Sequence, residues 1–170
     1  MKHALFIVAP ENFRDEEFFK PLEILQNADI DCTIASRNTG VCHGKLGGKV
    51  EAEIGLNQIN AEDFDAIIFI GGQGSQVFLD DPSAHLIAQK TVNNEKILAA
   101  ICAAPTILAR AGVLTNRNVT CFPAPELEKI LTESGANITQ ANVEIDGKII
   151  TANGPAAAKE FGEKILELLR

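Results

Sequence analysis

Short apolar runs alternate along the chain with segments in which apolar residues recur every third or fourth position. The runs are typical of buried strands, and the spaced segments are typical of helices that cover a core with one face. Strands are expected at Ala4–Ala9, Asp31–Ser36, Asp65–Ile70, Lys96–Ile101 and Asn118–Phe122, with a weaker signal at Val50–Ile54 and a hairpin at Val143–Ala152. Helices are expected at Arg14–Asn27, Ser83–Asn93, Pro105–Ala111, Glu126–Ser134 and Pro155–Leu169. This alternation predicts an α/β fold with a mostly parallel, doubly wound sheet and helices on both of its faces.

No linker, repeat or low-complexity segment interrupts the pattern, so we expect residues 1–170 to form a single domain. Hydrophobic residues make up 46% of the chain, which is enough for a sizeable core. The formal net charge of −8 argues against a surface for nucleic acid or for an anionic membrane, because both attract clustered Lys and Arg. No apolar segment reaches the ~20 residues of a membrane span, and the N-terminal run is too short for a signal peptide. The expected location is therefore the cytoplasm.

The four cysteines, Cys32, Cys42, Cys102 and Cys121, are far apart and form no C-x-x-C pair. A chain of this size needs no disulfides to stabilise it, so we expect four reduced thiols. Their spacing does not support a metal site either, and we expect no metal.

The segment Lys96–Gly112, KILAAICAAPTILARAG, changes from a strand pattern to a helical pattern at Cys102. Pro105 is tolerated in a first helical turn, so the cysteine lies between a strand end and a helix N-terminus. Free N–H groups and the positive end of the helix dipole favour the thiolate there. Alanines on both sides permit a sharp turn, so the segment predicts a nucleophile elbow with Cys102 at its apex. The alternative is a small buried apolar residue at a strand end.

Glu17 heads an apolar helical stripe that continues through Pro21, Ile24 and Ala28. Apolar surroundings disfavour the charged form of a carboxyl and raise its pKa. Pro21 would clash with the carbonyl of Glu17, so the helix is expected to begin irregularly and to aim the carboxyl at a neighbouring strand end. The alternative is a surface glutamate in an acid-rich first turn.

A glycine-rich segment, GGQGS at Gly71–Ser75, follows a predicted strand. Glycines let a backbone approach a ligand closely. The segment is not a dinucleotide fingerprint, because Val77 occupies the place of the last small residue, and it lacks the lysine of a P-loop. We expect instead an oxyanion hole formed by the backbone amides of Gly72 and Ala103, with a simple tight turn as the alternative.

Doubly wound sheets bind ligands outside the carboxyl ends of their strands. Cys102 and Gly71–Gly72 both follow predicted strands, and so does the segment after Ala9. We therefore expect the site at this edge of the sheet.

None of the three histidines lies next to Cys102 in the sequence. His3 begins a strand and His85 lies in the middle of a helix, so both are expected at the surface or in packing contacts. His43, in the loop VCHGKLGG, is a candidate general base, although nothing in the sequence places it within hydrogen-bond reach of the thiol.

Four segments together resemble the ThiJ/PfpI superfamily, which includes the Parkinson-disease protein deglycase and the PfpI-type intracellular proteases. The segments are FRDEEFFKP (Phe13–Pro21), GKLGGKVEAEIGLNQINAEDFDAIIFIGG (Gly44–Gly72), AAICAAPTILARAG (Ala99–Gly112) and IITANGPAAAKEFGEKILELL (Ile149–Leu169). The resemblance implies a flavodoxin-like α/β sandwich that forms a homodimer. It further implies that Cys102 is the reactive cysteine, that Glu17 hydrogen-bonds its thiolate, and that Gly72 and Ala103 are the oxyanion donors.

The chain departs from the family pattern at three positions. PfpI-type proteases carry a histidine directly after the cysteine and a glutamate after the double glycine, where this chain has Ala103 and Gln76. The deglycase branch has a histidine in the strand after the elbow helix, where this chain has Phe122. These departures argue against a protease triad and leave a dyad of Glu17 and Cys102, with Cys121 as a second thiol that is expected close by.

The resemblance and the residues together suggest a cofactor-independent enzyme whose Cys102 thiolate attacks a small reactive carbonyl, as a glyoxalase or deglycase does. Glu17, held protonated, would donate a hydrogen bond to the thiolate and later move protons. The expected partner is a small-molecule electrophile. The alternatives are chemistry like that of isocyanide hydratases, a PfpI-type protease, and a redox sensor or stress-response chaperone in which Cys102 is oxidised.

Overall fold

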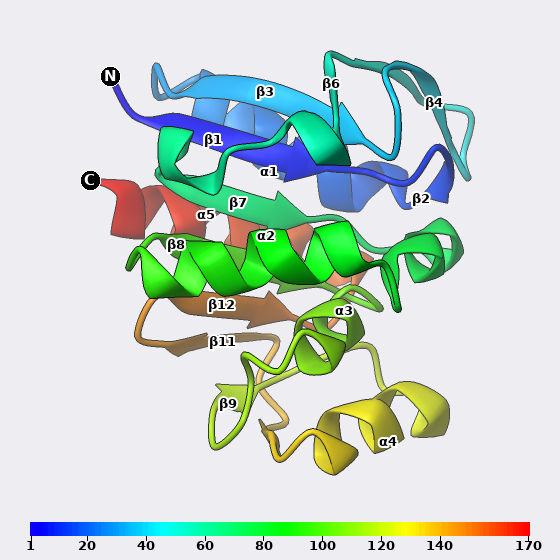
Figure 1. Ribbon diagram of the computed structural model, residues 1–170, viewed down its shortest axis with the longest axis vertical. Coiled ribbons are helices and arrows are strands. Elements are labelled where there is room, and N and C mark those ends of the chain that lie inside the picture. The colour runs from blue at the N-terminus through cyan, green and yellow to red at the C-terminus, as the bar shows by residue number, and fades with distance from the viewer.

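Seven strands form the central sheet of the protein, which is described over residues 1–170 by a computed structural model (Figure 1). Their order across the sheet is β11, β12, β8, β7, β1, β3 and β6. All neighbours are parallel except β11 and β12, which form the predicted antiparallel hairpin. The bounds are β1 His3–Ile7, β3 Asp31–Ser36, β6 Ile54–Gly55, β7 Ala66–Phe69, β8 Ile97–Ile101, β11 Val143–Asp146 and β12 Ile149–Ala152.

Helices cover both faces of this sheet, as the alternating pattern predicts (Figure 1). Helices α1 (Asp15–Gln26) and α5 (Ala158–Leu169) pack together on one face, while α2 (Pro82–Asn93) and α3 (Pro105–Arg110) lie on the other. Every residue of β7 and β8 is buried, because these central strands are covered on both sides. The expected mostly parallel α/β sandwich is therefore confirmed.

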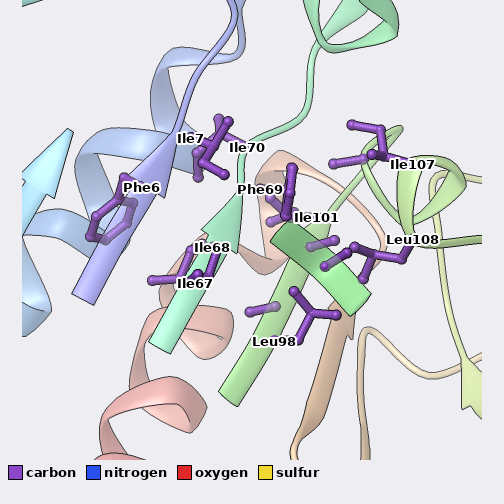
Figure 2. Close-up of a cluster of buried hydrophobic side chains, with 14 of the residues drawn as sticks. Phe6, Ile7, Ile67, Ile68, Phe69, Ile70, Leu98, Ile101, Ile107 and Leu108 are labelled. Atoms are coloured by element: carbon purple, nitrogen blue, oxygen red, sulfur yellow. The ribbon is translucent and has the colours of Figure 1, made fainter. Parts of the chain in front are cut away.

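The core contains apolar side chains from several of these elements. Figure 2 shows Phe6 of β1, Phe69 of β7, Leu98 of β8 and Leu108 of α3 within this buried cluster. No helix combines the length and the apolar character that a membrane crossing requires.

The predicted strand at Asn118–Phe122 is wrong in extent and in placement. Only Asn118–Val119 (β9) is a strand, and it pairs with β10 (Asn137–Ile138) in a separate two-stranded sheet. Beyond Val119 the backbone turns to β12 and to the residue after β8 instead. Thr120 donates its N–H to Oγ1 of Thr151 at 3.0 Å, and Phe122 donates its N–H to the carbonyl of Cys102 at 2.9 Å. Helix α4 (Pro125–Glu133) follows this segment.

A third sheet was not predicted. It contains β2 (Glu11–Phe13), β4 (Gly40–Gly44) and β5 (Lys49–Ala52), and its β4–β5 pair is antiparallel. The weaker strand signal at Val50–Ile54 corresponds to two strands, β5 of this third sheet and β6 of the central sheet. This small sheet lies beside the carboxyl end of β1, at the edge where the site is expected (Figure 1).

Candidate active site

Cys102 follows β8 directly and precedes α3, as the elbow prediction requires. Its φ of 65° lies in the left-handed region, which a residue with a side chain adopts only where its surroundings enforce it. The Cys102 N–H donates to the carbonyl of Ala152 at 2.8 Å, and its own carbonyl accepts the N–H of Phe122 at 2.9 Å. The elbow is therefore held by main-chain bonds on both sides of the cysteine.

Glu17 lies in the first turn of α1 and is fully buried. Its Oε2 accepts the N–H of Gly71 at 3.1 Å, while its buried Oε1 has no hydrogen-bond partner in the protein. A methyl group at Gly71 would lie 2.5 Å from Oε2 of Glu17 and 2.8 Å from Cβ of Cys102. Only glycine at this position lets the helix bring its carboxyl next to the elbow.

The two side chains strongly affect each other's protonation. Burial raises the pKa of the Glu17 carboxyl from 4.5 to about 8, against the opposing influence of the Cys102 thiol and the Gly71 amide. Burial, followed by the charge and hydrogen bonding of Glu17, raises the pKa of Cys102 to about 12. The amides of Gly72 and Ala103 act in the opposite direction. The sequence predicts that the helix N-terminus favours the Cys102 thiolate. That prediction is wrong while Glu17 is ionised, because the pKa of the thiol is then raised.

Burial outweighs the helix dipole for a simple geometric reason. Helix α3 has only six residues, so its dipole is small, whereas burial is the largest cause of the raised pKa of Cys102. Two of the causes that raise the thiol pKa act only while Glu17 is charged. Protonation of Glu17 removes both causes.

A cavity of about 440 Å³ opens onto this pair. Its wall combines the predicted oxyanion amides with polar and apolar side chains from several loops. The lining residues are Arg14, Glu17, Lys45, Gly72, Gln73, Gln76, Cys102, Ala103, Phe122, Ala124, Glu126, Leu127 and Pro155. The structure thus brings together all four residues of the predicted catalytic and oxyanion set, and no histidine lines the wall.

The two further candidates do not reach this cavity. His43 lies on β4, where its Nδ1 is 3.0 Å from Oε1 of Glu11, and it is not among the lining residues. Cys121 is buried behind the wall, donates its thiol to the carbonyl of Phe122 at 3.3 Å, and has its pKa raised to about 11 by burial. Neither residue supplies a base or a second thiol within the cavity.

Sequence reasoning missed three charged residues of the lining, Arg14, Lys45 and Glu126. Arg14 directly precedes α1, and a basic residue in the otherwise acidic segment RDEE was the available signal. Lys45 lies on the turn between β4 and β5, which belongs to the sheet that was not predicted. Gln76 departs from the family pattern, but the sequence alone does not place it in the cavity wall. Nowhere do three or more His, Cys, Asp or Glu side chains gather as a metal site would require.

Comparisons with known proteins agree with the fold. The sequence pattern of the DJ-1/PfpI family matches residues 2–168. Deglycase PH1704 of Pyrococcus horikoshii is 31% identical over 167 residues, which cover 98% of this chain and 99% of that protein. Glutathione-independent glyoxalase DJR-1.2 of Caenorhabditis elegans is 29% identical over 168 residues, which cover 99% of this chain and 89% of that protein.

Solved structures show the same relationship. The crystal structure of a ThiJ/PfpI domain protein from Brachyspira murdochii has a TM-score of 0.94 and 34% sequence identity, with 98% of this chain and 95% of that chain covered. The resemblance found in the sequence is thereby confirmed: this chain is a member of the DJ-1/PfpI family.

Proposed function

We propose that the protein is a cysteine-dependent, cofactor-independent enzyme that acts on small reactive carbonyls through Cys102 and Glu17, in the manner of a glyoxalase or deglycase. The observation that carries the proposal is the buried Glu17 carboxyl, with one oxygen on the Gly71 amide and the other unpaired, beside a thiol at a left-handed elbow. A deglycase and a glyoxalase among the relatives support the same class of chemistry.

The proposed reaction begins with Cys102 as the thiolate, its proton released to water, beside the protonated Glu17 carboxyl, whose pKa burial raises to about 8. The thiolate attacks the carbonyl carbon of the substrate, a C–S bond forms, and the electron pair of the C=O π bond moves onto oxygen. The N–H groups of Gly72 and Ala103 stabilise that oxyanion. Glu17 then gives its proton to the oxygen, and a neutral hemithioacetal forms. For methylglyoxal as the substrate, the Glu17 carboxylate next moves the proton of the former aldehyde carbon to the neighbouring carbon, which yields a thioester. Water cleaves the C–S bond of this thioester, so that the overall reaction adds one water, forms lactate and regenerates the thiol.

The lining of the cavity argues against peptide hydrolysis. A protease needs a base to activate the nucleophile and an acid to protonate the leaving amine. Ala103 and Phe122 occupy the positions of the family histidines, and no other histidine lines the wall. Small aldehydes are more electrophilic and require no amine to leave, so a cysteine and a glutamate suffice for them.

The experiment is to measure methylglyoxal consumption and lactate formation by the wild type, Cys102→Ser and Cys32→Ser. We expect Cys102→Ser to lose at least about 10³-fold in kcat/KM, since removal of a nucleophile has effects of this size. Cys32 lies on β3, outside the cavity, so its serine variant should match the wild type. Equal turnover by Cys102→Ser would contradict the proposal.

A redox sensor remains the alternative, and the same proteins distinguish it. If the wild type consumes neither small aldehydes nor isocyanides, while dilute peroxide oxidises Cys102 selectively, sensing replaces catalysis as the function. Turnover of isocyanides alone would indicate that the enzyme hydrates the isocyanide carbon instead.

A further inference from the structure

Arg14 places a guanidinium group at the cavity wall with part of its hydrogen-bonding capacity unused. Its Nε donates to Oε2 of Glu16 at 2.7 Å and its Nη2 to Oε1 of the same carboxylate at 3.5 Å, which leaves Nη1 free of protein partners. Besides this bond, the negative charges that Glu17 and Cys102 carry when ionised raise the pKa of Arg14. The guanidinium is therefore fixed by Glu16 within electrostatic reach of the reacting pair.

Lys45 reaches the same wall from a turn that is tied to the start of α1. Its N–H donates to the carbonyl of Phe13 at 2.9 Å. The buried carboxylate of Asp15 accepts the N–H groups of Leu46 at 2.9 Å and Gly48 at 2.8 Å. The segments that carry Arg14 and Lys45 are thus held to each other by main-chain and carboxylate bonds.

Gln76 contributes an unsatisfied donor to this wall. Its Nε2 is buried and has no hydrogen-bond partner in the protein. Buried polar atoms are nearly always paired, and leaving one unpaired is costly. Rotation of this side chain, which lines the cavity, would turn the amide towards an acceptor on a bound ligand.

The wall has few negative groups to oppose these three donors. Glu126, exposed on α4, is one of the two carboxyls in the lining. The other is Glu17. Burial raises the pKa of its carboxyl to about 8, so this group is protonated and uncharged at neutral pH. The lining residues thus carry two cations against one exposed anion at neutral pH, and Glu16, which lies outside the lining, offsets part of the Arg14 charge through their ion pair.

We propose that Arg14, Lys45 and Gln76 form a subsite for a carboxylate, so that the preferred substrate is a small α-oxoaldehyde bearing a carboxylate group. A planar carboxylate matches the paired donors of a guanidinium and accepts from an amide as well. 4,5-Dioxopentanoate carries an α-oxoaldehyde and a carboxylate, and methylglyoxal is its counterpart without the carboxylate. The substrate preference rests on the proposed function, but the carboxylate subsite can be tested without turnover.

The test compares two alkylating reagents of nearly the same shape, iodoacetate and iodoacetamide. Both form a C–S bond to the Cys102 thiolate and release iodide, so the ratio of their rates does not depend on how much thiolate is present. Mass spectrometry of the peptide containing Cys102 gives each rate. We expect the ratio of the iodoacetate rate to the iodoacetamide rate to be higher for the wild-type protein than for a short unfolded peptide that contains a cysteine.

Variants assign that preference to the subsite. Arg14→Met should lower the ratio about tenfold, as expected for loss of a charged hydrogen bond, and Arg14→Lys should restore part of it. Lys45→Met should lower the ratio up to about fivefold, because this cation is exposed and screened. Arg110→Met removes the same charge from a surface pair with Asp80 and should leave the ratio unchanged.

Two results would overturn the subsite. One is a wild-type ratio in both Arg14→Met and Lys45→Met while Cys102 is still labelled. The other is an equal fall in Arg110→Met, which would make the effect one of net charge. Should Arg14→Met fail to fold, Lys45→Met on its exposed turn still decides between these outcomes.

Turnover separates this subsite from the proposed function. We expect kcat/KM for 4,5-dioxopentanoate to exceed that for methylglyoxal, and the excess to fall in Arg14→Met. If neither aldehyde is consumed while the alkylation ratio still falls in the variants, the enzyme proposal fails and the carboxylate subsite stands. If both aldehydes are consumed and the ratio is insensitive to both variants, the subsite fails and the enzyme proposal stands.

Discussion

The floor and the rim of the cavity are built by different sheets. The floor comes from the carboxyl ends of β7 and β8, where Gly71 and Cys102 meet the buried carboxyl of Glu17. The rim comes from the small sheet, where Arg14 follows β2 and Lys45 lies between β4 and β5. Burial shifts the pKa values of the floor residues strongly, while water screens the charges of the rim.

This difference suggests a division of tasks. Proton transfer needs a group whose pKa lies close to the working pH, and burial provides such a group on the floor. Recognition of a charged substrate needs cations that stay solvated until the substrate arrives, and the rim provides these. Substitutions on the floor should therefore change the chemical step, and substitutions on the rim should change binding.

The largest expected effect is on the floor. Glu17→Gln should largely keep the contact with sulfur but lose proton transfer, and Glu17→Leu should lose both, so we expect kcat to fall by about 10²–10⁴-fold. The control is Glu23→Gln, which changes an exposed carboxyl on the same helix and should match the wild type. Methylglyoxal kinetics at a fixed pH provide the measurement. Near wild-type turnover in both Glu17 variants would remove this carboxyl from the mechanism.

The second effect concerns stability as a function of pH. The folded pKa of Glu17 is raised from 4.5 to about 8, so the unfolded chain releases this proton at lower pH than the folded protein does. Its contribution to stability is full below pH 4.5 and is lost as the pH rises towards 8. A glutamine at position 17 does not titrate.

Urea unfolding of the wild type and Glu17→Gln at pH 5 and pH 8 measures this contribution. Between these two pH values, the difference in free energy of unfolding should shift by about 3 kcal/mol in favour of the variant. A difference that stays constant with pH would show that the carboxyl is not held protonated by the fold.

The floor was largely predictable from the sequence and the rim was not. Continuous apolar runs mark β7 and β8 as covered on both faces, which places Cys102 and Gly71 at one edge without further information. Glu17 was found because it heads an apolar helical stripe. β2 and β4 are short and partly exposed, and β2 pairs with a strand far along the chain, so no local pattern identifies them.

Two errors share one cause, which is that local patterns omit long-range contacts. The helix N-terminus suggests a thiol of low pKa, but the burial of Cys102 beside Glu17, 85 positions away in the chain, reverses the sign. The apolar run at Asn118–Phe122 suggests one strand, but its second half bonds to Cys102 and to Thr151 rather than extending the strand. Neither contact leaves a periodic signal near these residues.

The smallest expected effect tests whether rim and floor are separable. Asp15→Ala removes the carboxylate that accepts the N–H groups of Leu46 and Gly48, and so releases the turn that carries Lys45. We expect a loss of about 2 kcal/mol in unfolding free energy, since bonds to a charged acceptor contribute on this scale. Asp80→Ala, which breaks only the exposed pair with Arg110, should cost much less.

Kinetics and hydrogen exchange complete this last test. Faster exchange of the Leu46 and Gly48 amides would show that the turn is released in Asp15→Ala. With the turn released, KM for 4,5-dioxopentanoate should rise severalfold, while kcat and the rate of Cys102 alkylation by neutral iodoacetamide should stay near the wild-type values, because the floor is held by its own main-chain bonds. A fall in kcat of the size expected for Glu17→Gln would mean that Asp15 also holds the start of α1, and with it the catalytic carboxyl. Rim and floor would then be one cooperative unit rather than two.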